Sequence, residues 1–391
     1  MTKTLVLHIG DPKTGSSSIQ HVLYHRQFTC DTRKLDYPPR LSAAQTANTL
    51  RGRRNDAKEQ AAFATLAAWA EASTANVLVV SAEQFSLVDP QTALAAFQKY
   101  LPDLAPTMRV IAYVRPHVSR FVSAYTQRTK VGILSTDMIS FYEKINQSKA
   151  LTFAARFHKW RAVFGPRFTL RAMARDELFG GDVVADFLNL ALDGAPVTLL
   201  AMTEANTSLP LETLSGLRLV QTVLTKNLVP DGTKHWVGSQ VNRLANAAAP
   251  GLGTKVRVSA PIYDSMLAKY RADAERLDAD FFGHPVMVPA LTRAAADVAP
   301  TDTDTKARQF FAKDQTRALR KLTTAMATGF LAFPSVWAAK FQHDNGQRPD
   351  LPPFEALTET EQAHIRTTDD LLIQIVTLIT LPLTNPTAEP Q

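Results

Sequence analysis

The sequence predicts an α/β protein in which helices flank a parallel sheet, with a helical appendage at the C-terminal end. Two observations predict this fold class. Short apolar runs rich in β-branched residues each end at Gly, Pro or polar residues, which is the form of strands buried on both faces. Alanine-rich, helix-favouring stretches lie between these runs, and such alternation indicates a parallel sheet with right-handed crossovers.

The first half of the chain supplies the predicted strands. They are residues 4–9, 76–81, 108–114 and 168–172. Helices are expected over residues 60–72, 91–100 and 151–164. The last of these ends at Gly165 and Pro166, because Gly favours the end of a helix and Pro cannot continue it.

Helical patterns dominate after residue 183. We expect helices at residues 183–191, 211–228, 241–249, 261–277, 306–329 and 353–381. Residues 298–305 are interpreted as a linker, and residues 343–353 are rich in turn formers. The predicted organisation is an α/β domain over residues 1–298 and a helical C-terminal extension over residues 299–391.

The composition is that of an ordinary globular protein, with 45% hydrophobic and 20% charged residues. The 43 Lys and Arg against 36 Asp and Glu give a formal net charge of +7, which favours anionic ligands without identifying one, and we expect no nucleic-acid partner. The lone Cys30 excludes an internal disulfide, and no Cys or His spacing fits structural zinc. A reducing compartment is therefore expected.

Two apolar segments bear on localisation. Residues 5–9 are too few for the apolar region of a signal peptide. Residues 371–383 are fewer than the roughly 20 that a membrane helix needs. We therefore expect a cytoplasmic protein without an integral membrane segment.

The most informative segment is the first turn from a strand to a helix, residues 8–20 (HIGDPKTGSSSIQ). Its glycines, its run of Ser hydroxyls and the helix N-terminus suit a phosphate or sulfonate, whereas the alternative is a plain turn. Gly10 and Gly15 have the spacing of the Walker A motif, but Ser16 stands where the lysine belongs and Lys13 precedes the second Gly. No Walker B aspartate ends a predicted strand, so a magnesium-dependent NTPase or kinase is disfavoured.

A second group of polar residues follows the strand at 108–114. Arg115 ends this strand, and Ser119 and Ser123 fall one helical turn apart in the predicted helix that Pro116 begins. Arg suits bidentate binding of phosphate, and the carboxyl edge of a parallel sheet is where α/β proteins bind ligands. The alternatives are a structural ion pair for Arg115 and a surface position for Ser123.

Together these segments resemble the sulfotransferases that use 3′-phosphoadenosine 5′-phosphosulfate (PAPS). The first motif is residues 12–20 (PKTGSSSIQ), and the second is R-P-x-x-x-R-x-x-S-x-Y over residues 115–125. Residues 81–85 (SAEQF) resemble the family's strand-end Ser-x-Glu segment. Residues 160–165 and 206–210 occur in the order expected of bacterial members. The resemblance covers about residues 1–290 and implies a P-loop-like sulfotransferase fold.

The resemblance implies a role for each motif residue. Lys13 would bind the phosphosulfate and stabilise charge on the departing phosphate, and further donors would come from Thr14, Gly15, Ser16, Ser17 and Ser18. Arg115 and Ser123 would bind the 3′-phosphate. Such a site acts by orientation and electrostatics, and no metal is expected for the transfer.

The general base is predicted less directly. Glu83 follows the second predicted strand at the ligand-binding edge and is the first candidate, with a supporting role as its alternative. Many bacterial relatives have a His soon after a Tyr-Pro pair, but here no His follows Tyr37 and Pro38 closely. His117 is a weaker candidate, and His8 lies inside a strand, where packing is expected.

The favoured function is a PAPS-dependent sulfotransferase acting on a carbohydrate or small-molecule acceptor. The alternative is a catalytically inactive nucleotide-binding or interaction module that retains the PAPS pocket. A catalytic pair of Lys13 and Glu83 favours the enzyme, because a binding module needs no base. The sequence predicts neither the acceptor nor the oligomeric state.

Overall fold

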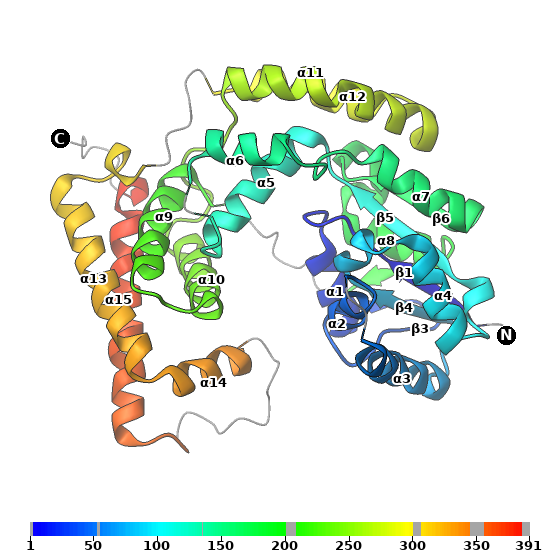
Figure 1. Cartoon of the computed structure of the whole chain (residues 1–391), viewed down its shortest axis with the longest axis horizontal. Coiled ribbons are helices and arrows are strands. Elements are labelled where there is room, and N and C mark those ends of the chain that lie inside the picture. Colours follow the sequence, from blue (N-terminus) through cyan, green and yellow to red (C-terminus); the bar gives the residue numbers. More distant parts are fainter. Residues whose placement is uncertain are drawn as a thin grey trace. The chain divides into compact units, whose positions relative to one another are not determined.

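A computed structural model describes residues 3–52, 55–134, 136–200, 209–299, 306–344 and 356–384, and Figure 1 shows its helices and strands. Contacts between residues divide the chain into two units, each assembled from separate segments. The first unit contains Met1–Arg120, Lys149–Ala205 and Asp264–Ala296, and the second contains Phe121–Ser148, Asn206–Tyr263 and Asp297–Gln391.

The first unit is built on a five-stranded sheet of order β3-β4-β1-β5-β6, in which neighbouring strands are parallel. Its strands are β1 (Thr4–His8), β3 (Leu35–Asp36), β4 (Val77–Ser81), β5 (Arg109–Val114) and β6 (Phe168–Ala172). The predicted α/β class and the four predicted strands are confirmed. Strand β3 has only two residues and so carries no periodic pattern that could predict it. A small antiparallel sheet pairs β2 (Phe28–Thr29) with β7 (Thr198–Leu199).

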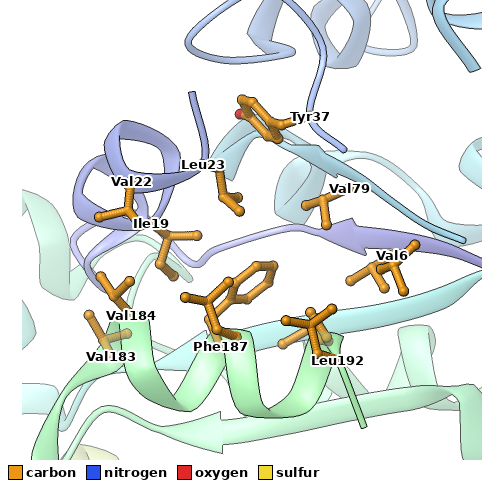
Figure 2. Packing of buried hydrophobic residues seen from close by; sticks show 14 of the residues in the cluster. Val6, Ile19, Val22, Leu23, Tyr37, Val79, Val183, Val184, Phe187 and Leu192 are labelled. Atoms are coloured by element: carbon orange, nitrogen blue, oxygen red, sulfur yellow. The ribbon is translucent and has the colours of Figure 1, made fainter. Parts of the chain in front are cut away.

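Helices cover both faces of the main sheet. On one face Val6 of β1 belongs to an apolar cluster with Ile19 of α1 and Phe187 of α8 (Figure 2). Leu5 and Leu7 point to the opposite face, because side chains alternate along a strand, and both are fully buried. The helices of this unit are α1 (Ser16–Tyr24), α2 (Ala44–Thr49), α3 (Asp56–Ala72), α4 (Pro90–Tyr100), α7 (Ala154–Phe164), α8 (Val183–Ala191) and α12 (Met287–Arg293), with the start of α5 (His117–Lys130) and most of α11 (Ala260–Leu277).

The second unit is helical in its described residues. Besides the remainders of α5 and α11, it contains α6 (Met138–Asn146), α9 (Leu211–Lys226), α10 (Asp231–Ala248), α13 (Lys313–Ala332), α14 (Pro334–Asp344) and α15 (Glu359–Thr384). Helix α9 approaches α15 so closely that a Cβ on Gly216 would lie 2.8 Å from the side chain of Ile379. This division differs from the predicted segments 1–298 and 299–391, because α9 and α10 bury their apolar faces against the C-terminal helices. An amphipathic pattern shows that a helix is covered on one face but does not identify its partner.

Two further expectations concern the C-terminal half. The predicted linker 298–305 and the turn-rich segment 343–353 fall mostly outside the described residues. No single helix in the described part of the chain is long and apolar enough to cross a membrane, although one bent pair, Lys313–Ala332 with Pro334–Phe341, meets the test by length and composition.

His8 lies inside β1 and is packed, as expected. Its side chain is fully buried, and its Nδ1 atom lies 2.8 Å from the hydroxyl of Ser81. Burial lowers the pKa of His8 from 6.5 to about 3, because the charged imidazolium would lose its hydration. His8 is therefore neutral in the folded protein.

Because His8 is buried and neutral, we expect the folded protein to become less stable as the pH is lowered. Between pH 6.5 and about 3 the unfolded chain binds a proton at His8 that the folded chain does not, so the free energy of unfolding decreases as pH falls through this range. One such proton contributes about 1.4 kcal/mol per pH unit. The variant His8→Asn cannot titrate, and we expect urea unfolding to show a shallower pH dependence. An unchanged slope would contradict a neutral His8.

Candidate active site

The loop between β1 and α1 lies at the carboxyl edge of the sheet. The backbone N–H groups of Ile9 and Asp11 donate to the carbonyls of Ile111 and Tyr113, and Tyr113 N–H donates to the Gly10 carbonyl. These bonds extend the parallel pairing of β1 with β5 beyond the end of the strand. The loop backbone is thereby fixed before α1 begins at Ser16.

Three positions of the loop have positive φ. They are Gly10 (71°), Lys13 (69°) and Gly15 (82°). A Cβ on Gly10 would lie 2.9 Å from Cβ of Glu83, and a Cβ on Gly15 would lie 2.7 Å from Cγ1 of Val183 in α8. Only glycine fits at these two close approaches, so the loop backbone packs tightly between the end of β4 and α8.

The N-terminus of α1 has no side-chain cap and has features that favour an anion. Gly15 at the N-cap gives no side-chain cap, and the first turn contains no acidic residue. Ser16 is buried, yet its hydroxyl has no hydrogen-bond partner among the described residues, whereas Ser17 is exposed and Ser18 is partly buried. Thr14 is also buried, and its hydroxyl donates to the Asp11 carbonyl at 2.5 Å. Free N–H groups, the helix dipole and an unpaired hydroxyl favour a bound phosphate or sulfonate.

Glu83 lies beside this loop, at the start of a 3₁₀ turn that directly follows β4. Burial raises its pKa above the usual glutamate value, and the charge of Asp11 adds to this effect. The Lys13 ammonium, the Arg120 guanidinium and a hydrogen bond from the Lys13 backbone N–H act in the opposite direction. The structure therefore brings the two predicted catalytic residues, Lys13 and Glu83, together.

Arg115 joins the second motif to the first. It follows β5, and its Nε donates to the Ser119 hydroxyl at 3.3 Å, while its Nη1 donates to the Lys13 carbonyl at 3.4 Å. Burial and the nearby charge of Arg120 lower its pKa. Ser123 lies one helical turn beyond Ser119 on α5, past the boundary between the two units. Lys13, Glu83 and Arg115 are thus gathered at one edge of the sheet.

Sequence analysis missed a buried acidic residue in the loop and an arginine that faces it. The Asp11 side chain is 1% exposed and forms ion pairs with Arg120 Nε at 3.2 Å and Arg156 Nη2 at 2.7 Å. Arg120 stands inside the second motif, whereas nothing in the sequence links Arg156 of α7 to the loop. Lys13, Arg115 and these two arginines oppose Asp11 and Glu83, which leaves a net charge of +2 to attract an anion.

His117 lies in a packed environment. It is fully buried, its Nε2 lies 3.0 Å from Oδ2 of Asp273, and its ring stacks on Tyr270. Asp273 also accepts hydrogen bonds from the backbone N–H groups of Phe153 and Ala154 at the start of α7. The surroundings of His117 therefore assign it a packing role.

No protein-family model matches the chain, and no curated protein or solved structure is significantly similar to it. Within the described residues, no group of three His, Cys, Asp or Glu side chains could hold a metal ion. Residues 206–208 of the predicted segment 206–210 lie outside the described part. Function must therefore be inferred from the residues at the edge of the sheet.

Proposed function

We propose that the chain is a sulfotransferase with a P-loop-like sulfotransferase fold, which transfers the sulfonate of PAPS to a hydroxyl or amine of a carbohydrate or small-molecule acceptor. One observation carries the proposal. The Lys13 carbonyl accepts a hydrogen bond from Arg115, and Gly10 of the same loop packs against Glu83, whose pKa the charge of Lys13 lowers, so the three motif residues meet at one loop. The parallel sheet places this loop where α/β proteins bind ligands.

The anion-binding features fit the phosphosulfate end of PAPS. The uncapped N-terminus of α1 and the unpaired, buried Ser16 hydroxyl offer donors, and the net charge of the site is positive. The glycines let the loop backbone pack directly against Glu83 and Val183, because a side chain at either position would collide with these neighbours. PAPS is the co-substrate that supplies the sulfonate.

The proposed reaction is an in-line displacement at sulfur. The acceptor oxygen or nitrogen forms a bond to sulfur, while the bond from sulfur to the bridging phosphate oxygen breaks. The acceptor proton passes to the Glu83 carboxylate, and its raised pKa makes it a stronger base than an ordinary glutamate. Lys13 and the start of α1 stabilise the negative charge on the departing phosphate.

Arg115 is assigned to the 3′-phosphate, which makes a prediction about nucleotide selectivity. Arg115→Ala is expected to weaken PAPS binding by roughly 2–3 kcal/mol, because a charge-assisted contact is lost. Adenosine 5′-phosphosulfate lacks the 3′-phosphate, so its affinity should change little. Calorimetric titration of both nucleotides checks this, and equal weakening would show that Arg115 supports the loop instead.

The experiment that tests the function is turnover of PAPS labelled in its sulfonate. The wild-type protein is incubated with a panel of sugars and polysaccharides, and with no acceptor. The proposal predicts label in at least one acceptor and slow release of free sulfate in its absence. Binding of the nucleotide without any turnover would instead identify a catalytically inactive binding module.

A further inference from the structure

Two hollows adjoin between α10 and α15 of the second unit, two helices that Figure 1 labels. One has a volume of about 500 Å³ and the other of about 360 Å³, and both fall in the size range of small-molecule sites. Leu244 of α10 and Ile373 of α15 line both hollows, so the two form one groove, which we call the α10–α15 groove. From Trp236 to Ala248, α10 follows this groove for about 18 Å.

The smaller hollow is apolar. Its lining residues other than the two shared ones are Ala248, Val376, Leu381 and three threonines of α15, Thr377, Thr380 and Thr384. The three threonine hydroxyls donate to the backbone carbonyls four residues earlier in α15, at 2.9, 2.9 and 3.3 Å. Because these donors are satisfied inside the helix, a hydrocarbon chain can fill the hollow without leaving one of them unpaired.

The larger hollow carries charge. Arg243 of α10 is exposed, and its guanidinium donates at 2.9 and 3.1 Å to the neutral side-chain oxygen of Gln240. The ammonium of Lys340 in α14 lies 5.8 Å from the centre of the Trp236 ring. Asp369 of α15 opposes these two cations, which leaves the three charged side chains with a net charge of +1. This end of the groove therefore favours an anionic group.

The groove is narrow at its floor. Leu372, Val376 and Thr380 line it and yet are each 5% exposed or less, whereas Ile373 at the rim is 54% exposed. An α-helix is about 10 Å wide and would rest on the rim. An extended peptide would bring backbone N–H and C=O groups into the apolar hollow, where burying them is unfavourable. A single hydrocarbon chain can reach the floor.

We propose that the α10–α15 groove binds a single-chain amphiphile with an anionic headgroup, such as a fatty carboxylate. The chain lies in the apolar hollow, and the headgroup lies near Arg243 and Lys340. The inference does not depend on the proposed function, because the groove contains no residue of the candidate active site.

Chain length and headgroup charge test the inference. The wild-type protein is titrated calorimetrically with decanoate, dodecanoate and tetradecanoate, each below its micelle concentration, and the affinity should rise with chain length. A fully buried methylene strengthens binding about fourfold, and we expect at least about twofold per methylene in this partly open groove. Dodecyltrimethylammonium has the same chain as dodecanoate but the opposite charge, and it should bind more weakly.

Two variants of exposed residues locate the chain. Ile373→Asp places a charge where the two hollows meet and should weaken dodecanoate binding at least about tenfold, because the chain would desolvate this charge. Leu331→Asp is the matched control, since Leu331 is 47% exposed in the same unit and lines neither hollow. Ala248→Trp fills the apolar end, so it should abolish the gain from dodecanoate to tetradecanoate and leave decanoate binding nearly unchanged.

Arg243→Gln locates the headgroup. It should weaken dodecanoate binding about twofold to fivefold, which is the range for one exposed ion pair, and should not weaken binding of dodecyltrimethylammonium. Arg320→Gln changes an exposed arginine of the same unit that lines neither hollow, and it should leave both affinities unchanged.

Several results would overturn the inference. They are an affinity that does not depend on chain length, equal binding of dodecyltrimethylammonium, and dodecanoate binding that survives both Ile373→Asp and Ala248→Trp. A wild-type dimer in sedimentation that Ile373→Asp dissociates would also overturn it, because a second copy of the chain would then cover the groove.

Discussion

Lys13→Ala is expected to reduce PAPS turnover by about a hundredfold or more while the protein still folds. Lys13 lies in the loop that links Glu83 and Arg115, where it would face the charge that develops on the departing phosphate. Loss of one preorganised electrostatic partner costs about 3 kcal/mol in activation free energy. Release of labelled sulfate from PAPS measures the effect without requiring a known acceptor.

The matched control for Lys13 is Lys34→Ala. Lys34 is an exposed lysine of the same unit, and its structural bonds are made by its backbone N–H and carbonyl, which the substitution retains. We expect the control to keep wild-type turnover and both variants to keep the wild-type circular dichroism spectrum. Wild-type turnover by Lys13→Ala would contradict its assignment to the leaving group.

Glu83→Gln is expected to reduce transfer by ~10²–10⁴-fold with nearly unchanged nucleotide affinity. Glutamine keeps the shape of the side chain but cannot accept the proton. In the wild-type protein the rate should fall as pH decreases through the Glu83 pKa, which burial raises above the usual glutamate range. The variant should lack this acidic limb. The measurement requires an acceptor from the labelled PAPS screen.

The control for Glu83 is Glu71→Gln, which changes an exposed glutamate of the same unit. It should keep both the rate and the acidic limb. If Glu83→Gln weakens nucleotide binding and retains the acidic limb, Glu83 supports the loop and another group is the base. His117 is a poor replacement, because it is fully buried against Asp273.

The parts of the fold that could be predicted are those with a strong local pattern. The four long strands have continuous apolar sequences because both faces of the sheet are covered. In β1, for example, Leu5, Val6 and Leu7 are all completely buried. The two-residue strand β3 has no such pattern. Its pairing with β4 depends on contacts between segments far apart in the sequence.

The residues of the candidate site also differ in how far the sequence could predict them. Lys13, Glu83 and Arg115 each follow a strand of the parallel sheet, so their meeting at one edge could be predicted from topology. The ion pair between Asp11 and Arg156 could not be predicted from the sequence. The packing of α7 against the rest of the unit determines which charged side chain reaches Asp11. Acidic residues next to glycine in loops are common and usually solvated.

The most direct test of the central claim is a calorimetric titration of the wild-type protein with 3′-phosphoadenosine 5′-phosphate, AMP and magnesium ATP. If Arg115 binds a 3′-phosphate and the α1 loop binds the 5′ end, the bisphosphate should bind at least about tenfold more tightly than AMP, since one charge-assisted contact contributes about 1.5–3 kcal/mol. Magnesium ATP should not displace it. Equal affinities for the bisphosphate and AMP, or tighter binding of magnesium ATP, would contradict a PAPS-dependent sulfotransferase.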